Sequence, residues 1–167
     1  MDLLYRHMET ADEPKVRELT KKCHPTWPAR PKFWYHANPT IVCSLDLDGE
    51  RIVGYGSYTV DNHPAGSSFI QYLRDSAVDP DYRGQGIGRA LIQKRMQVGR
   101  QVGCAMFVGM TWPDNKPMRA ILESEGFHAC QTVPMAFQYN DLPDDVSAAS
   151  RQDGIIYINA GAHDHEA

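Results

Sequence analysis

Three glycines occupy alternate positions in the run Arg83-Gly84-Gln85-Gly86-Ile87-Gly88, directly before a segment whose apolar residues have helical spacing. Glycine has no Cβ atom, so the backbone N–H groups of such a run can approach a ligand closely. A helix that begins there adds unpaired N–H groups and the positive end of its dipole. These features are typical of a pyrophosphate-binding turn, to which the side chains of Arg83 and Arg89 can add charge-assisted hydrogen bonds.

Two common phosphate-binding motifs do not fit this run. A Walker loop has Lys and then Ser or Thr after its last glycine, whereas Arg89-Ala90 follows Gly88 here. A dinucleotide-binding fingerprint has the spacing G-x-G-x-x-G and opens a βαβ unit, whereas the spacing here is G-x-G-x-G and several predicted strands precede it. A site for an acyl-coenzyme A is the third interpretation.

The elements that would position this turn follow a mixed order. Period-two or continuous apolar patterns predict strands over 2–8, 41–47, 51–60, 68–78, 104–110, 127–139 and 154–160. Helical spacing predicts helices over 12–23, 30–37, 86–101 and from Asp114 or Asn115 to Glu125, with Gly126 ending the last. Thr10 and Glu13 have the spacing of a capping box for the first helix. This order favours a mixed α/β (α+β) sheet with helices on its faces over a doubly wound parallel sheet.

Composition indicates one ordinary globular domain over 1–167, because the chain is 42% hydrophobic and 23% charged and shows no linker. The formal net charge of -4 and the pI of about 5.9 make a nucleic-acid partner improbable. No apolar run is long enough for a membrane span, and the first residues do not form a signal peptide, so we expect a cytoplasmic protein without a membrane partner.

The metal-ligating residue types are scattered. The four cysteines form no CxxC pair and are expected to be reduced, mostly buried thiols: Cys23, Cys43, Cys104 and Cys130. His163-Asp164-His165 lies in a terminal segment, 161–167, that is expected to be a flexible tail. We therefore expect no metal cofactor.

The glycine run resembles the R/Q-x-x-G-x-G/A signature of the GCN5-related N-acetyltransferases, the GNAT family. The surrounding residues, Ala77-Val78-Asp79-Pro80 and Ala90-Leu91, also match the family, as do Asn115 and Gly126-Phe127 in an N-x(10)-G-F pattern. The resemblance covers essentially the whole chain. It implies a seven-stranded, mostly antiparallel sheet flanked by helices, in which the central parallel strands 68–78 and 104–110 are splayed.

The resemblance also implies a cofactor and a reaction. Acetyl-CoA, or another acyl-CoA, would be the co-substrate, and a primary amine of a small molecule or peptide would attack it directly in a ternary complex. The backbone of Ala77 and Val78 would bond the pantetheine arm. The pyrophosphate would be held at Arg83, Gly84, Gln85, Gly86, Ile87, Gly88 and Arg89. Asn115 would approach the pantetheine or the acyl end, or would only cap its helix.

The catalytic groups are less clear from the residues. The Val78 amide is the expected oxyanion donor. Family members often carry a Tyr seven residues after the Asn to protonate the leaving thiolate, but this chain has Leu122 there. Other candidate donors are Tyr72, Tyr139 and Ser124.

The base and the acceptor pocket also rest on the resemblance. Family bases often project from the positions of Tyr72 and Arg74, but Arg74 stays protonated and would instead bind an acidic part of the acceptor. Asp75 has the opposite strand parity and is expected to face away. Trp34 and Tyr35 would either line the acceptor pocket or pack in the core. Further bases in loops are His36, Asp61 and His63.

A second function stays open beside the transferase. Leu122 and the lack of an obvious base fit an acyl-CoA-binding sensor or partner-binding module with the same fold. A nucleic-acid modifier of this fold is disfavoured by the acidic pI. Homodimers are common among such proteins, so a homodimer is possible here.

Overall fold

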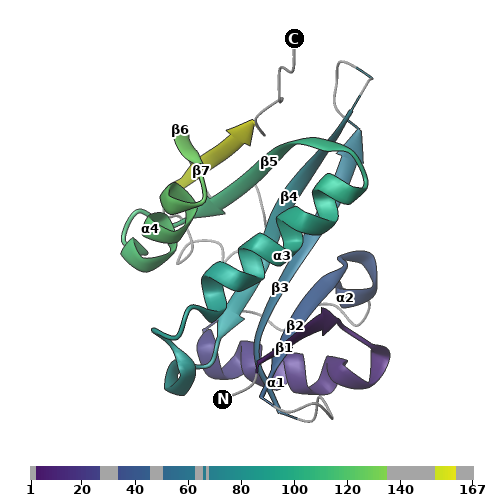
Figure 1. Cartoon of the computed structure of the whole chain (residues 1–167). Coiled ribbons are helices and arrows are strands. Elements are labelled where there is room, and N and C mark those ends of the chain that lie inside the picture. The colour runs from purple at the N-terminus through teal and green to yellow at the C-terminus, as the bar shows by residue number, and fades with distance from the viewer. Residues whose placement is uncertain are drawn as a thin grey trace.

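The computed structural model describes residues 3–26, 34–45, 51–62, 66, 68–134 and 153–160. Seven strands form one sheet in the order β1-β2-β3-β4-β5-β7-β6 (Figure 1). They are Leu4–His7 (β1), Thr40–Ser44 (β2), Ile52–Asn62 (β3), Phe69–Val78 (β4), Cys104–Thr111 (β5), His128–Pro134 (β6) and Asp153–Ala160 (β7). All neighbours are antiparallel except β4 and β5, which are parallel. The predicted fold class is confirmed.

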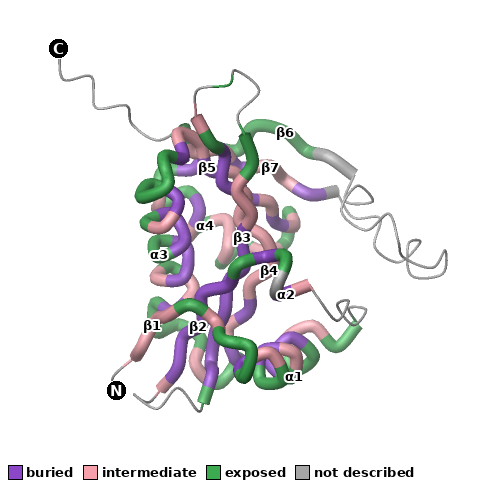
Figure 2. The backbone as a smooth tube through the Cα atoms, turned by 90° about the vertical axis from the view of Figure 1, so that its right-hand side faces the viewer, coloured by how far each residue is buried: buried purple, intermediate pink, exposed green. Residues whose placement is uncertain are grey.

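Helices cover both faces of this sheet. They are Glu13–Cys23 (α1), Trp34–Ala37 (α2), Ile87–Gln101 (α3) and Lys116–Ser124 (α4). On one face, Val16 and Leu19 of α1 pack against Tyr55 and Ala77. On the other face, α3 packs over β3, and α4 joins α3 in a second cluster over β5 and β7. Figure 2 shows the buried stretches of β2 and β3 between these helices, whereas β6 at the sheet edge is exposed.

The first helix begins differently from the prediction. Asp12, rather than Glu13, reaches back, and its Oδ2 accepts a hydrogen bond from the Glu9 amide at 2.8 Å. Thr10 belongs to a 3-10 turn, Thr10–Asp12, that precedes α1. Pro14 explains the shift, because proline fits the first helical turn, where its missing N–H is not needed. The capping box predicted at Thr10 and Glu13 is therefore wrong by one residue.

The later helix ends agree with the sequence. Asn115 caps α4, its Oδ1 accepting a hydrogen bond from the Met118 amide at 3.3 Å. Gly126 follows the helix with a φ of 82°, which glycine adopts without strain. The predicted Asp48-Gly49 turn, the tail 161–167 and part of the strand predicted over 127–139 lie outside the described residues.

The thiols are less buried than predicted. Cys43 and Cys104 are buried, but Cys23 is half-buried and Cys130 is exposed on the edge strand β6. None of the four forms a disulfide.

The buried polar side chain of Gln71 on β4 leads to a prediction about stability. Its side chain is fully buried beneath α3, and neither its amide nitrogen nor its oxygen has a hydrogen-bond partner among the described residues. Unsatisfied buried polar atoms cost about 1–3 kcal/mol, and an apolar side chain of the same shape removes that cost. Gln71→Met should therefore raise the free energy of unfolding by roughly 1–2 kcal/mol, measured by urea denaturation.

Gln131→Met is the matched control, because Gln131 is exposed on β6. Its effect should stay within about 0.5 kcal/mol. Destabilisation by Gln71→Met, with Gln131→Met neutral, would contradict the burial argument.

Candidate active site

The parallel strands β4 and β5 pair along only part of their length. Paired residues run from Phe69 with Cys104 to Tyr72 with Val108. Beyond that point β4 continues to Val78 beside β3 alone, and β5 continues to Thr111 beside β7 alone. The two strands diverge in Figure 1. After Tyr72, the edges of β4 and β5 that face each other therefore have backbone N–H and C=O groups without hydrogen-bond partners in the sheet.

The glycine turn lies at the far end of the divergent part of β4. Gly84 and Gly86 have φ values of 77° and 81°, a left-handed conformation that other residues adopt with strain. The first helical bond of α3 joins the Ala90 amide to the Gly86 carbonyl at 3.0 Å. The amides of residues 87–89 therefore have no acceptor among the described residues. A Cβ atom added at Gly84 or Gly86 would meet nothing within 4 Å, so the turn is open to a ligand.

Gly88 brings three elements together. A Cβ atom there would lie 3.4 Å from Ile121 Cδ1 of α4 and 3.9 Å from Val78 Cγ2 of β4. The predicted cofactor residues of the glycine turn and the end of β4 thus meet at one place. Asn115 is placed as the cap of α4, and its predicted contact with a cofactor stays a prediction.

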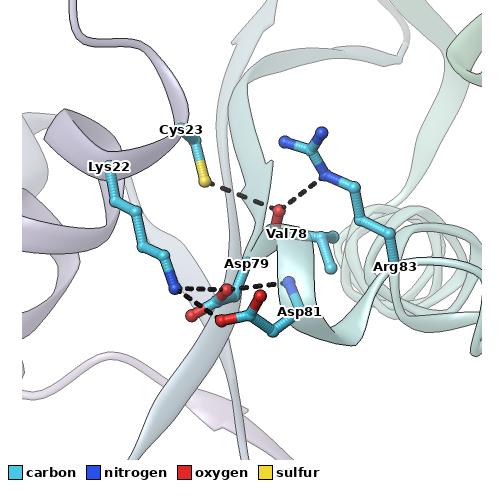
Figure 3. A network of polar contacts seen from close by, with 6 residues as sticks. All are labelled: Lys22, Cys23, Val78, Asp79, Asp81 and Arg83. Carbon is cyan, nitrogen blue, oxygen red and sulfur yellow. Dashed lines mark hydrogen bonds and ion pairs between the residues drawn. The ribbon is translucent and has the colours of Figure 1, made fainter.

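The Val78 carbonyl receives two side chains (Figure 3). Arg83 Nε donates to it at 3.1 Å, and Cys23 Sγ donates at 3.5 Å from the end of α1. Burial raises the pKa of the Cys23 thiol, although the neighbouring Arg83 guanidinium opposes this shift. The thiol therefore stays protonated and is a donor, not a nucleophile.

An ion-pair network ties α1 to the same turn. Lys22 Nζ lies 2.7 Å from Asp79 Oδ1 and 3.0 Å from Asp81 Oδ2 (Figure 3). Asp79 Oδ1 also accepts the Asp81 amide at 3.1 Å. Burial alone would raise the pKa of the Asp79 carboxyl, but the bonds from Lys22 and the Asp81 amide outweigh it and lower that pKa. The carboxylate is ionised at neutral pH and holds the start of the glycine turn against α1.

A β-bulge interrupts β4 next to the last pair with β5. Gly56 opposes Ser76 and Tyr58 opposes Leu73, so the single residue Ser57 faces two residues, Arg74 and Asp75. The bulge reverses the alternation of side chains. Asp75 lies two residues before Ala77, which pairs with Tyr55 and packs with it against α1. Burial chiefly raises the pKa of the Tyr55 hydroxyl, and the nearby Asp75 charge adds to that shift. The prediction that Asp75 faces away is therefore wrong.

Tyr72 and Arg74 face the same side as Asp75. Arg74 Nε donates to Thr59 Oγ1 at 3.1 Å, and its guanidinium lies 5.3 Å from the centre of the Tyr72 ring. Both residues are half-buried. The cation of Arg74 and the phenol of Tyr72 therefore contact each other where β4 leaves β5, next to Asp75 in the strand.

The predicted aromatic wall is mainly core. Tyr35 is 3% exposed, and its ring meets Tyr55 edge-on at 6.1 Å. The Thr20 hydroxyl lies 3.1 Å from the Tyr35 hydroxyl and 2.8 Å from the Tyr55 hydroxyl. Trp34 is half-buried against the same cluster. This hydroxyl cluster joins α1 and α2 to the strand face that carries Asp75.

The alternative proton donors lie elsewhere. Leu122 is buried, its Cδ2 lying 3.2 Å from where a Cβ of Gly109 would be. The Ser124 hydroxyl donates to the Ile121 carbonyl at 2.8 Å and accepts from Arg89 at 2.9 Å, so it faces α3 rather than β4. Arg89 also pairs with Glu125 at 3.4 Å. Tyr139 lies outside the described residues, as do His63 and the side chain of His36.

The family of the chain follows from a comparison with known sequences. Residues 5–127 match the model of the acetyltransferase (GNAT) family. The chain belongs to this family. The predicted resemblance is confirmed, and the matched residues include the glycine turn at 83–88.

Curated relatives of this GNAT chain include two kinds of N-acetyltransferase. The thialysine N-epsilon-acetyltransferase of Sus scrofa is 35% identical over 90 residues, which cover 48% of this chain and 52% of that protein. The glucosamine 6-phosphate N-acetyltransferase of Trypanosoma brucei brucei is 38% identical over 55 residues, 32% of this chain and 37% of that protein. The matched region thus spans about half, or less, of each relative.

Solved structures share the fold at low identity. Arabidopsis thaliana NAA60 in complex with acetyl-CoA matches with a TM-score of 0.76 and 13% identity, covering 95% of this chain and 98% of that one. The Escherichia coli ribosomal-protein-S18-alanine N-acetyltransferase matches with a TM-score of 0.71 and 22% identity, covering 97% and 98%.

The positions of several residues near the site were not predicted from the sequence. Lys22 and Cys23 end an unremarkable helix, and no local signal links them to a strand more than fifty positions later. Arg95 did have a signal, because it lies among Leu91, Ile92, Met96 and Gly99 on the buried face of α3. A charged residue on an apolar helix face is exceptional and needs a partner.

The described residues contain neither a membrane-spanning helix nor a candidate metal site. None of the helices there is long and apolar enough to cross a membrane. The same part of the chain contains no group of His, Cys, Asp and Glu side chains suited to a metal ion.

The Asp79 carboxylate makes a pH-dependent contribution to stability. Its pKa is lowered on folding, so the contribution is present above the unfolded pKa of about 3.9 and is lost as the pH falls through the lower folded pKa. Asp79→Asn should lower the melting temperature at pH 7, and the difference from the wild type should shrink below about pH 4.

Asp81→Asn is the control, since the Asp81 side chain is 73% exposed and its pair with Lys22 is solvated. It should change the melting temperature less than Asp79→Asn at pH 7. Equal effects of the two variants, or a gap that persists in acid, would refute the role of Asp79.

Proposed function

We propose that this protein is an acetyl-CoA-dependent N-acetyltransferase in which a primary amine attacks the thioester directly in a ternary complex. The observation that carries the proposal is the end of β4–β5 pairing at Tyr72 and Val108. An unpaired strand edge then runs from a bulge with acidic and basic side chains to an open helix N-terminus. Family membership supports the same reaction.

The dimensions of β4 suit a pantetheine arm. Residues 74 to 78 of an extended strand span about 13 Å, which is comparable to the arm between pyrophosphate and sulfur. The amides of residues 84–89 would hold the pyrophosphate at the start of α3, with Arg83 and Arg89 beside it. The backbone of Ala77 and Val78 would bond the arm. The thioester would then lie near Asp75.

Asp75 is the proposed general base. The acceptor ammonium gives one proton to the Asp75 carboxylate, and the neutral nitrogen forms a bond to the acetyl carbon. The carbonyl electrons move to an oxyanion, for which a β4 backbone amide beside Asp75, beyond the paired segment, is the proposed donor. The Val78 amide predicted from the sequence lies about 10 Å further along the strand, beside the proposed pantetheine arm. When the C–S bond breaks, its electron pair leaves with sulfur, and the second nitrogen proton neutralises the thiolate. The products are an amide, a thiol and the protonated base.

The proton transfer to sulfur has no dedicated side chain from α4 in this proposal. Leu122 cannot donate a proton, and Ser124 bonds to Arg89. Among the predicted donors in the described residues, Tyr72 lies at the end of the paired segment. It would be the donor nearest to the proposed thioester position. A thiolate is a tolerable leaving group near neutral pH, so water or Tyr72 suffices as the donor.

A small primary amine with an anionic group is the proposed acceptor. Arg74 is held by Thr59 and the Tyr72 ring one residue from Asp75. Its guanidinium suits a carboxylate or phosphate on the acceptor. Two relatives are named for small amines, thialysine and glucosamine 6-phosphate, and the second of these carries a phosphate.

The glycine turn provides the binding test. Gly86→Glu and Arg83→Glu should each weaken acetyl-CoA binding by at least about tenfold in isothermal titration, because a carboxylate would face the pyrophosphate. Gly66→Glu is the matched control, since Gly66 also has a positive φ, 82°, with no atom within 4 Å of an added Cβ, and it lies outside the turn. Wild-type protein that binds no acyl-CoA would refute the proposed function.

The base provides the catalytic test. Asp75→Asn should lower kcat with a primary amine acceptor by about a hundredfold at pH 7 and leave the acetyl-CoA affinity unchanged. Glu18→Gln, which neutralises an exposed carboxylate on α1, should keep wild-type kcat. Unchanged turnover in Asp75→Asn would exclude the base role. Tight acetyl-CoA binding without amine-dependent thiol release, in the wild type, would favour the sensor interpretation.

A further inference from the structure

Arg95 is a buried cation outside the machinery described so far. Its side chain lies on the inner face of α3 and is only 2% exposed. Burial lowers the pKa of its guanidinium to about 10, so it is still charged at neutral pH. No carboxylate among the described residues forms an ion pair with it. Burying a charge without a counter-ion is costly, so the chain retains Arg95 against its own stability.

Within the described part of the chain, both side-chain hydrogen bonds of Arg95 are to backbone carbonyls. Nε donates to the Leu91 carbonyl at 3.1 Å within α3, and Nη1 donates to the Ser57 carbonyl of β3 at 3.0 Å. The side chain passes over Gly56, where an added Cβ would lie 2.7 Å from Arg95 Nε and 2.8 Å from Cζ. A side chain at position 56 would therefore displace the guanidinium from its place beside Ser57.

The Ser57 carbonyl points toward the bulge of β4. The amide of the next residue, Tyr58, donates to the Pro39 carbonyl at 2.9 Å, on the side of β2. The peptide between Ser57 and Tyr58 is trans, so its carbonyl points the opposite way, toward β4. Ser57 is the residue that faces both Arg74 and Asp75. Arg95 thus bonds β3 at the point where regular pairing with β4 fails.

We propose that Arg95 is a positioning residue that holds the β3–β4 bulge and so keeps Asp75 on the acceptor face of β4. The guanidinium takes up a carbonyl that a regular ladder would direct at a β4 amide, which favours the two-against-one register. This inference rests on the proposed transferase function, because it assigns the consequence of the bulge to the base. A slip by one residue would turn Asp75 to the α3 face.

A variant that removes the charge of Arg95 but keeps its volume should lower kcat without lowering the free energy of unfolding. Arg95→Met removes a costly buried cation and should leave the free energy of unfolding equal or higher. It should lower kcat by about 10- to 100-fold, since small displacements of a catalytic group have effects of that size. The KM for acetyl-CoA should stay within about twofold, because the glycine turn lies two helical turns away. An ordinary structural role would instead lower stability and leave kcat of the folded fraction unchanged.

Matched variants sharpen the test. Gln71→Met also removes a buried polar group beneath α3, but beside the paired part of β4, and should keep wild-type kcat. Arg95→Lys retains a donor and should recover part of the lost kcat. Gly56→Ala displaces the guanidinium by its methyl group and should lower kcat in the same way. The double variant Gly56→Ala, Arg95→Met should be no slower than Arg95→Met alone, because both changes remove one contact.

A crystal structure of Arg95→Met tests the role of Arg95 in the β3–β4 register independently of enzyme activity. The expected result is a changed register, with Ser57 paired to one residue of β4 and Asp75 turned from Tyr55. If Arg95→Met does not fold, the structure and kcat of Gly56→Ala take its place. An unchanged bulge, or wild-type kcat in both Arg95→Met and Gly56→Ala, would overturn the proposal. If the wild type has no transferase activity, the proposed function fails, and the register in the variant still decides the role of Arg95.

Discussion

The site depends on the failure of β4 to stay paired with β5 beyond Tyr72. Pairing ends there, and the bulge at Arg74 and Asp75 follows at once. A bulge bends its strand and increases the local twist, so the same irregularity turns β4 away from β5 and turns Asp75 toward α1. Divergence leaves backbone groups without sheet partners. The fold therefore creates, through one irregularity, both the edge proposed to bond the cofactor and the face proposed to carry the base.

The cations at the turn already have partners, which limits what they can add to cofactor binding. Arg83 bonds the Val78 carbonyl, and Arg89 bonds Ser124 and Glu125. A phosphate that attracts them replaces existing hydrogen bonds, so the net gain is a difference between two sets of contacts. The amides after Gly86 have no such partners among the described residues. The backbone of the turn, rather than its arginines, is therefore the main source of the proposed affinity, and Asp79 with Lys22 fixes where that backbone begins.

Local patterns were sufficient for the order of elements, the cap at Asn115, the glycine that ends α4 and the family signature, because each depends on neighbouring residues. They failed for Asp75 and for the start of α1. Side-chain parity holds only while a strand stays regular, and the bulge at residues 74 and 75 depends on Ser57 and Arg95, which are distant in sequence. At α1 the competing factor was Pro14, which moved the helix start to Glu13. The contact of Cys23 with Val78 joins segments 55 positions apart, and no pattern in either segment predicts it.

Leu122 shows how core packing and chemistry compete at one position. Its side chain lies against Gly109, and Leu73 of β4 comes within 3.9 Å of the same place, just beyond the last β4–β5 pair. The end of the paired segment is thus sealed by apolar groups on the side of α3 and α4. A tyrosine there would bring a hydroxyl to the strand edge, but it would also put a polar atom into this contact, with a cost unless it is bonded. With Leu122 this contact stays apolar. The apolar surroundings strengthen the electrostatic effect of the charged side chains on the opposite face of β4, Arg74 and Asp75. In the proposed mechanism, both candidate proton-transfer side chains therefore belong to β4: Tyr72 as a donor to sulfur, and Asp75, the only carboxylate in that strand, as the base.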